Sequence, residues 1–202
     1  MGGFIVLEGL DGAGTTTQAE RLVARLAALG EVVATREPTA GPVGRLIRST
    51  LRAEADAPAR STLPWMFAAD RSDHLARVVE PAVARGAWVV SDRYVPSSLA
   101  YQSLDLPLDV PWGLNQAFRA PDLLLFLKVA PDVALERVMR RAGAREIFEE
   151  ADTLRRVAHQ YAVSLDRLRQ RGDRIVVIDG SRGVDEVEAQ VWAAVQAVVG
   201  AR

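Results

Sequence analysis
The sequence predicts a three-layer α/β fold in which a parallel sheet of five strands is flanked by helices on both faces. Five short apolar runs without polar alternation recur along the 202 residues, a pattern typical of strands that are buried on both faces. Segments with the apolar spacing of helices lie between these runs. Strands that alternate with helices in this way form parallel sheets with right-handed crossovers.

The five runs predict strands at residues 4–8, 31–36, 87–92, 122–129 and 174–179. Helical spacing is clearest in two sets, Leu22, Leu26 and Leu29, and Leu154, Val157, Tyr161 and Leu165. A chain of this length fits one compact domain, and no repeat or low-complexity linker interrupts it. We therefore expect residues 1–202 to form a single domain.

Composition excludes several classes of function. Hydrophobic residues make up 49% of the chain and charged residues 25%, ordinary values for a soluble globular protein rather than a membrane protein. A net charge of −1 gives no bulk electrostatic reason to bind nucleic acid. Cysteine is absent, which excludes disulfides and thiolate metal sites and suits a reducing compartment. The N-terminal segment does not resemble a signal peptide, so we expect a cytoplasmic protein.

Polar residues follow four of the five predicted strands. These clusters are Asp11, residues 36–38 (Arg-Glu-Pro), residues 92–94 (Asp-Arg-Tyr) and residues 179–181 (Asp-Gly-Ser). They could be turn residues that close each strand. Because ligands of parallel sheets bind beyond the carboxyl ends of the strands, four clusters at that edge favour a binding site.

A glycine-rich loop follows the first predicted strand, in the stretch "EGLDGAGTTTQ" from Glu8 to Gln18. Its glycines stand between a strand and a helix, where backbone N–H groups and the helix N-terminus stabilise a polyphosphate. The pattern G-x-x-x-x-G-K-[ST] is matched except at its lysine, which is Thr15 here. Loss of the lysine should weaken transition-state stabilisation more than binding. A turn that only packs the helix onto the strand is the alternative.

The stretches that carry a family resemblance are, in order, "EGLDGAGTTTQ", "TREPTAGPVGRLIR", "FAADRSDH", "VVSDRYVPSSLAYQ", "PDLLLFLKVAPDVALERVMRR" and "EIFEEADTLRRVAHQYAVSL". Together they resemble the thymidylate kinase family, from Phe4 to about Ser181, and the "EIFE" stretch resembles the lid of archaeal-type members. The resemblance implies a P-loop kinase that phosphorylates dTMP to dTDP with ATP and Mg²⁺. It also implies a homodimer.

For the donor, the resemblance implies ATP binding by Gly9, Leu10, Asp11, Gly12, Ala13, Gly14, Thr15, Thr16, Thr17 and Arg137. It implies Mg²⁺ binding by Thr16 and Asp92, and catalytic roles for Asp11, Arg93, Arg141 and Arg145. A lid at about 137–149 would carry Arg137, Arg140, Arg141 and Arg145, with Gly143 as a flexible point. A solvated basic helix end is the alternative for some of these arginines. Asp92 could also cap the helix that follows it, and this would be compatible with its role in binding Mg²⁺.

For the acceptor, the resemblance implies that Arg36 and Arg93 hold the phosphate of dTMP, since arginine makes two charge-assisted hydrogen bonds to one phosphate. Phe67 would stack on thymine and Arg71 would contact its exocyclic oxygen. Ser98 and Gln102 would make polar contacts to the base, and Tyr101 would crowd a ribose 2′-hydroxyl.

Simpler roles stay open for several of these residues. Arg36 could form a surface ion pair with Glu37. Phe67, with Trp65 and Met66, could pack in the core, and Tyr101 could be a buried aromatic residue. His74 and His159 read as ordinary helix residues.

The sequence departs from the family pattern at Thr15 and at Lys128, where relatives more often carry aspartate. Lys128 is the only lysine in the chain. We therefore hypothesise that it partly supplies the missing charge, although an exposed lysine at a strand end is the commoner explanation. Three functions remain: an active dTMP kinase, a nucleotide-binding protein without catalysis, and a kinase for another deoxynucleotide or nucleoside.

Overall fold

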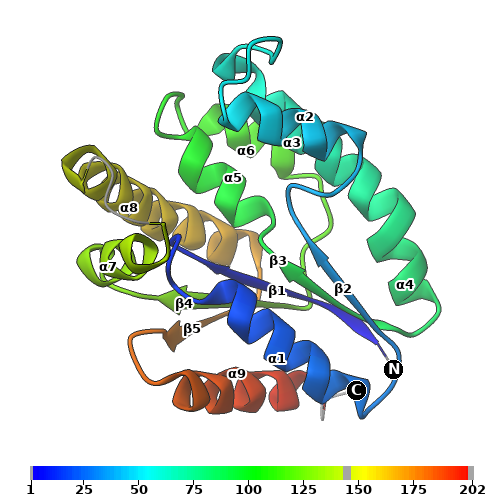
Figure 1. Ribbon diagram of the computed structural model, residues 1–202. Coiled ribbons are helices and arrows are strands. Elements are labelled where there is room, and N and C mark those ends of the chain that lie inside the picture. Colours follow the sequence, from blue (N-terminus) through cyan, green and yellow to red (C-terminus); the bar gives the residue numbers. More distant parts are fainter. Residues whose placement is uncertain (1, 143–146, 200–202) are drawn as a thin grey trace.

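A computed structural model describes residues 2–142 and 147–199, and it describes the backbone alone for residues 141, 142 and 147–150 (Figure 1). Five parallel strands form one sheet in the order β2-β3-β1-β4-β5. The strands are β1 (Gly3–Gly9), β2 (Val32–Arg36), β3 (Trp88–Asp92), β4 (Leu123–Lys128) and β5 (Ile175–Asp179). The predicted strands and the parallel sheet are therefore confirmed, and β1 lies at the centre of the sheet.

The strands differ in burial according to their place in the sheet. Every residue of β1 and β3 is buried, and so is β4 up to its last residue. The edge strands β2 and β5 are only partly covered, and Val177 in β5 is 44% exposed. The prediction of burial on both faces is wrong for these two strands, because each has a neighbouring strand on one side alone.

Helices cover both faces of the sheet (Figure 1). One face is covered by α1 (Thr15–Ala27) and α9 (Val184–Val199). The other is covered by α5 (Val95–Gln102), α8 (Ile147–Arg171) and a long helical segment that comprises α3 (Leu63–His74), the π-helical turn η2 (Leu75–Val79) and α4 (Glu80–Ala84). Farther from the sheet are α2 (Pro42–Leu51), the 3₁₀ turn η1 (Arg60–Thr62), α6 (Asp109–Asn115) and α7 (Pro131–Ala142). No described helix is long and apolar enough to cross a membrane.

The apolar spacing predicted the core faces of α1 and α8 with one error. Leu22, Leu26, Leu154, Val157, Tyr161 and Leu165 are all buried, as predicted. Leu29 is 56% exposed, because α1 ends at Ala27 and the chain turns away before Gly30. The α8 residues pack on the same side of the sheet as α5, where the polar groups of the candidate site also lie.

Candidate active site
The loop between β1 and α1 takes a shape that requires glycine at two positions. Gly12 and Gly14 have φ of 89° and 95°, in the left-handed region that other residues avoid. A Cβ atom at Gly12 would lie 2.3 Å from the carbonyl oxygen of Ala134 in α7, so a side chain does not fit there. The first N–H groups of α1 have no acceptor within the helix and are available to a phosphate.

Thr15 and Thr16 differ in what their side chains do. Thr15 is 6% exposed, so the position that carries lysine in the usual pattern holds a short, buried side chain. Thr16 Oγ1 donates a hydrogen bond of 2.6 Å to Asp92 Oδ2, at the end of β3. Asp92 Oδ1 is buried and has no hydrogen-bond partner among the described residues. Asp92 does not cap the helix that follows it, because α5 has no side-chain cap.

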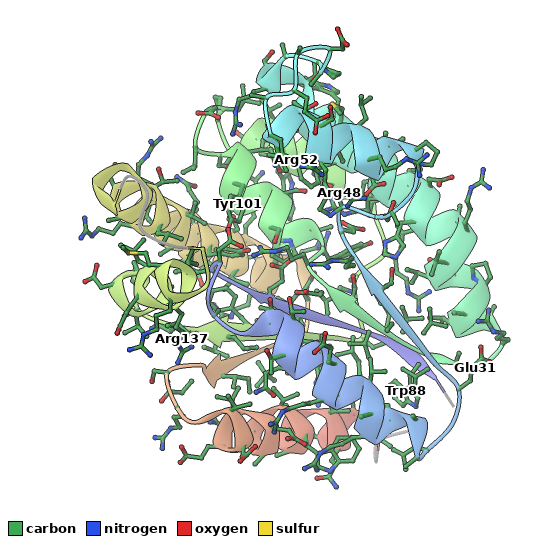
Figure 2. The ribbon with its side chains drawn as sticks, viewed as in Figure 1. Glu31, Arg48, Arg52, Trp88, Tyr101 and Arg137 are labelled. Atoms are coloured by element: carbon green, nitrogen blue, oxygen red, sulfur yellow. The ribbon has the colours of Figure 1, made fainter. Side chains whose placement is uncertain are left out.

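The donor cavity, as we name it, lies beside this loop and has a volume of about 270 Å³. It is lined by Gly12, Thr17, Gln18, Arg137, Arg140 and Arg182, among others. Arg137 extends from α7 to the connection between β5 and α9, where its Nη1 donates to the carbonyl oxygen of Gly180 at 2.9 Å (Figure 2). Arg140 forms an ion pair with Glu136 at 2.6 Å. The side chain of Arg141 lies outside the described part of the chain, as do Gly143 and Arg145.

The acceptor cavity, of about 270 Å³, lies between α3 and α5. It is lined by Asp11, Phe67, Arg71, Arg93, Ser98, Tyr101 and Gln102, together with Glu37. The fold thus brings together most of the predicted acceptor residues from two separate segments of the sequence, residues 67–71 and 93–102. Gln102 Oε1 is buried and has no partner within the described residues. Trp65, by contrast, is 52% exposed, so its assignment to the core is wrong.

Arg71 is fixed from several sides at the floor of this cavity and is only 1% exposed. Its Nε and Nη2 donate to Glu37 Oε2, at 2.9 and 2.6 Å. Nη2 also donates to Ser98 Oγ at 3.0 Å, and Nη1 donates to Asn115 Oδ1. These contacts fix the guanidinium rigidly and use four of its five N–H donors, so one N–H group on Nη1 has no partner among the described residues and is left for a ligand.

Sequence reasoning missed Glu37, which lines this cavity, and His74, which contacts Glu37. Glu37 Oε1 lies 2.9 Å from His74 Nδ1, and His74 Nε2 lies 2.7 Å from Thr35 Oγ1 in β2. Glu37 therefore connects a buried histidine to Arg71, and it does not pair with Arg36. The signal was present in the sequence, because His74 follows Arg71 by three residues and so lies on the same helix face.

Arg36 stands apart from that network. Its side chain is 67% exposed, and its Nη2 lies 3.8 Å from Asp92 Oδ2. Arg36, Asp92 and Thr16 line a third cavity, of about 490 Å³, between α1 and β2. Arg36, the residue predicted to bind the dTMP phosphate, therefore lies near the loop. Its exposed guanidinium is accessible to an anion there.

Arg93 links the loop to the acceptor cavity. Its Nη2 donates to Asp11 Oδ1 at 2.5 Å, and its Nη1 donates to the carbonyl oxygen of Gly9 at 3.4 Å. Tyr101 extends from α5 toward the same loop and donates to Asp11 Oδ2 at 3.0 Å (Figure 2). Burial opposes the charge of Arg93, but the nearby phenols and carboxylates hold its pKa well above the ordinary value. Burial also raises the pKa of Tyr101.

Lys128 lies at the exposed end of β4, away from the donor cavity. It lines a different cavity, of about 380 Å³, together with Leu10 of the loop and with Asp166 and Arg169 of α8. Among the described residues that line the donor cavity, the positive charges are arginines. The geometry therefore favours the simpler explanation of Lys128, an exposed lysine at a strand end.

The chain is similar to known proteins over most of its length. The family model for thymidylate kinase matches residues 7–191. A thymidylate kinase of Methylobacillus flagellatus is 42% identical over 198 residues, which cover 94% of this chain and 95% of the relative. A probable thymidylate kinase of Pyrobaculum aerophilum is 38% identical, with 97% of each chain covered. A thymidylate kinase of Deinococcus radiodurans is 39% identical, with 95% of each covered. This chain belongs to the thymidylate kinase family.

Proposed function
We propose that this chain transfers the γ-phosphoryl group of ATP to dTMP and releases ADP and dTDP. Members of the family are phosphotransferases, and the three curated relatives described above are named thymidylate kinases. The observation that carries the proposal is the position of Arg93, which bonds to Gly9 of the loop and to Asp11 at the mouth of the acceptor cavity. A donor phosphate on the loop and an acceptor phosphate at that mouth would meet at one guanidinium.

On the donor side, the phosphates of ATP would lie on the loop. The residues that we assign to this site are Gly9, Leu10, Asp11, Gly12, Ala13, Gly14, Thr15, Thr16, Thr17 and Arg137. Backbone N–H groups and the N-terminus of α1 would bind the phosphates, and the donor cavity would take the adenosine. The Arg137 side chain lines that cavity and is held by the carbonyl oxygens of Gly180 and Ser181.

On the acceptor side, the thymine of dTMP would enter the cavity between α3 and α5. Phe67 would stack on the base, and Arg71, Ser98 and Gln102 would address its polar edge. The unpartnered Gln102 Oε1 supports a ligand donor at that point. Tyr101, held by Asp11, would exclude a 2′-hydroxyl.

The acceptor phosphate would lie between Arg36 and Arg93. Its oxygen attacks the γ-phosphorus, and the bond to the bridging oxygen of ADP breaks as the new P–O bond forms. No general base is required, because the attacking oxygen is already ionised. The protein therefore contributes position and positive charge, with Asp11 and Arg93 at the reacting groups.

Thr16 and Asp92 would hold Mg²⁺. Mg²⁺ prefers one or two protein oxygen ligands together with waters and phosphates. The donor set fits, since Asp92 Oδ1 is buried and has no hydrogen-bond partner in the described part of the chain, and Thr16 Oγ1 donates to Oδ2 of the same carboxylate. The described residues contain no group of three or more His, Cys, Asp or Glu that could form a fully protein-bound site. The ion would neutralise phosphate charge when bound.

Residues 137–149 would form a lid over ATP. Arg137 and Arg140 line the donor cavity and support this assignment. Arg141 and Arg145 are predicted catalytic arginines whose side chains lie outside the described residues. Their roles rest on the family resemblance.

We also propose a homodimer that works in the cytoplasm. Leu46 on α2 is 43% exposed and Trp65 on α3 is 52% exposed, and the two helices pack together. Large apolar side chains on neighbouring helices are typical of a surface that another protein covers. Sedimentation velocity would test this assembly. The lack of cysteine agrees with a reducing compartment.

The test is ADP formation from ATP and dTMP with Mg²⁺, measured for the natural chain and for Thr15→Lys. We expect steady turnover by the natural chain, because other cations stand near the loop. No turnover, with activity restored by Thr15→Lys, would instead identify a nucleotide-binding protein without catalysis. A panel of nucleoside monophosphates would detect the third function, since faster turnover of another acceptor than of dTMP would contradict the assigned substrate.

A further inference from the structure
Tyr161 lies in the middle of α8, and its hydroxyl reaches the polar groups beneath the phosphate loop. The side chain is fully buried. Its Oη lies 3.0 Å from Glu8 Oε2 and 3.2 Å from the carbonyl oxygen of Gly9, the first glycine of the loop. It also lies 3.3 Å from Arg93 Nη1. One hydroxyl on α8 therefore contacts both the loop and the arginine that faces the acceptor cavity.

The contacts can be sorted by which group donates. A phenol has one hydrogen to give and can accept hydrogen bonds in return. Burial raises the pKa of Tyr161, and the charge of Glu8 raises it further, so the phenol keeps its proton. Glu8 and the Gly9 carbonyl can only accept from it, whereas Arg93 can only donate to it. Tyr161 therefore bridges the buried carboxylate of Glu8 and the partly buried guanidinium of Arg93.

Arg93 needs such support because its backbone is strained. Its φ is 80°, a left-handed conformation that residues other than glycine rarely adopt. Ser97 Oγ accepts from its Nη1 at 2.9 Å, and Asp11 accepts from its Nη2 at 2.5 Å. The Tyr161 hydroxyl lies on the Nη1 side, next to Ser97. The guanidinium is thus fixed from two sides beside Gly9.

The place of Arg93 beside the loop matters because the chain carries Thr15 where the usual pattern has lysine. In the usual loop a lysine bridges the β and γ phosphates and neutralises charge in the transition state. Thr15 is short and buried here, and it brings no charge. Arg93 is a cation that hydrogen-bonds directly to the loop.

We propose that Tyr161 is a positioning residue that holds Arg93 against the phosphate loop, where Arg93 supplies the charge that lysine provides in the usual pattern. The proposal rests on the proposed phosphoryl transfer. It concerns the hydroxyl alone, because the ring of Tyr161 has a separate packing role against Phe126, at 5.1 Å between ring centroids. Tyr161→Phe keeps the ring and removes the bridge.

The experiment is a double-mutant cycle of Tyr161→Phe and Thr15→Lys. The measurements are kcat and the KM of ATP and of dTMP. In the natural background we expect Tyr161→Phe to lower kcat about tenfold, the effect of one lost hydrogen bond to a charged group, with little change in the KM of ATP. In the Thr15→Lys background the loss should shrink to about twofold, because the lysine then supplies the charge. Equal losses in both backgrounds would overturn the proposal.

Thr50→Val is the control. Thr50 is also buried, and its hydroxyl donates to the carbonyl oxygen of Leu46 within α2 at 3.0 Å, away from Arg93. The variant loses one buried hydrogen bond, as Tyr161→Phe does, so it should lower the melting temperature and leave kcat unchanged. If Thr15→Lys does not fold, the comparison of Tyr161→Phe with Thr50→Val still tests the proposal, because equal effects of the two variants on kcat would refute the positioning role.

The result also separates this proposal from the function on which it rests. If the natural chain forms no ADP, both the proposed phosphoryl transfer and the positioning role of Tyr161 are contradicted. If the natural chain turns over and Tyr161→Phe leaves the rate unchanged, the positioning role alone is contradicted.

Discussion
Around the acceptor cavity, side chains hold one another through buried ion pairs, whereas around the donor loop the backbone itself supplies most of the binding groups. Arg71 is fixed by Glu37, and Glu37 is fixed in turn by His74. On the donor side the shape of the chain at Gly12 and Gly14 aims N–H groups at a phosphate. Loss of a side chain therefore has different consequences in the two regions.

This difference explains how the loop can carry Thr15. Backbone N–H groups bind a phosphate whatever side chain follows Gly14, so substitution of the lysine removes charge but not the binding shape. The acceptor cavity depends on charged side chains instead of backbone groups, and a buried charge that loses its partner strongly destabilises the folded state. We therefore expect the acceptor side to depend on particular side chains and the donor side to depend on particular glycines.

Glu37→Gln should disrupt the network around Arg71 in the acceptor cavity. We expect it to have the largest effect of the variants described here, a loss of unfolding free energy. It leaves the buried guanidinium of Arg71 without its carboxylate, which typically costs about 3–5 kcal/mol of unfolding free energy. Urea denaturation would measure the loss. Glu31→Gln, which removes an exposed ion pair with Arg85, is the control and should have little effect. Similar losses in the two variants would show that the Glu37 pair is not essential.

Gly12→Ala should damage the donor side more than Gly14→Ala does. Both residues have positive φ, so each alanine incurs about 1–2 kcal/mol of backbone strain. At Gly12 the new Cβ would also collide with the carbonyl oxygen of Ala134, whereas at Gly14 no atom of the described residues beyond the two chain neighbours lies within 4 Å of the Cβ. We expect a clearly lower melting temperature and weaker ATP binding for Gly12→Ala, measured by thermal unfolding and calorimetry. Equal behaviour of the two variants would contradict the close approach of α7.

Glu8 lies beneath the loop and should make stability depend on pH. Burial raises its pKa above the ordinary 4.5, despite the opposing effect of Arg93 and of hydrogen bonds from Ser97. The folded state therefore holds this proton more tightly than the unfolded state does. As pH rises from 4.5 through the raised pKa, Glu8 should reduce stability by about 1.4 kcal/mol for each unit of the shift.

Urea denaturation at several pH values, for the natural chain and for Glu8→Gln, would measure this contribution. Glutamine binds no proton in this range, so the natural chain should lose stability relative to Glu8→Gln as pH rises. A stability difference that does not change with pH would show that the pKa of Glu8 is the same in both states.

Lys128→Ala should have the smallest effect. The lysine lines a cavity with Asp166 and Arg169, apart from the donor cavity, so we expect kcat to stay within about twofold of the natural value. Initial rates at saturating ATP and dTMP would measure it. A tenfold loss would restore the hypothesis that Lys128 replaces the missing charge.

Much of the candidate site could be predicted because its residues occur in local patterns. Phe67 and Arg71 are four residues apart on one helix and line one cavity, as their spacing indicated. Tyr101 was predicted from its motif, and the structure adds its bond to Asp11. The spacing of His74 from Arg71 places the two residues on the same helix face, but the partners of His74, Glu37 and Thr35, come from another segment and no local pattern predicts those contacts.

The sequence by itself determined the order of strands and helices, the position of the loop and the family, because apolar periodicity and glycine spacing are local properties of the chain. Only the tertiary structure decided which strands are edges, that Lys128 lines a different cavity from the donor cavity, and that Tyr161 bridges Glu8 and Arg93. These contacts join residues far apart in sequence. Such pairs form only when the sheet brings the ends of its strands together and α8 packs over them, so no local pattern records them.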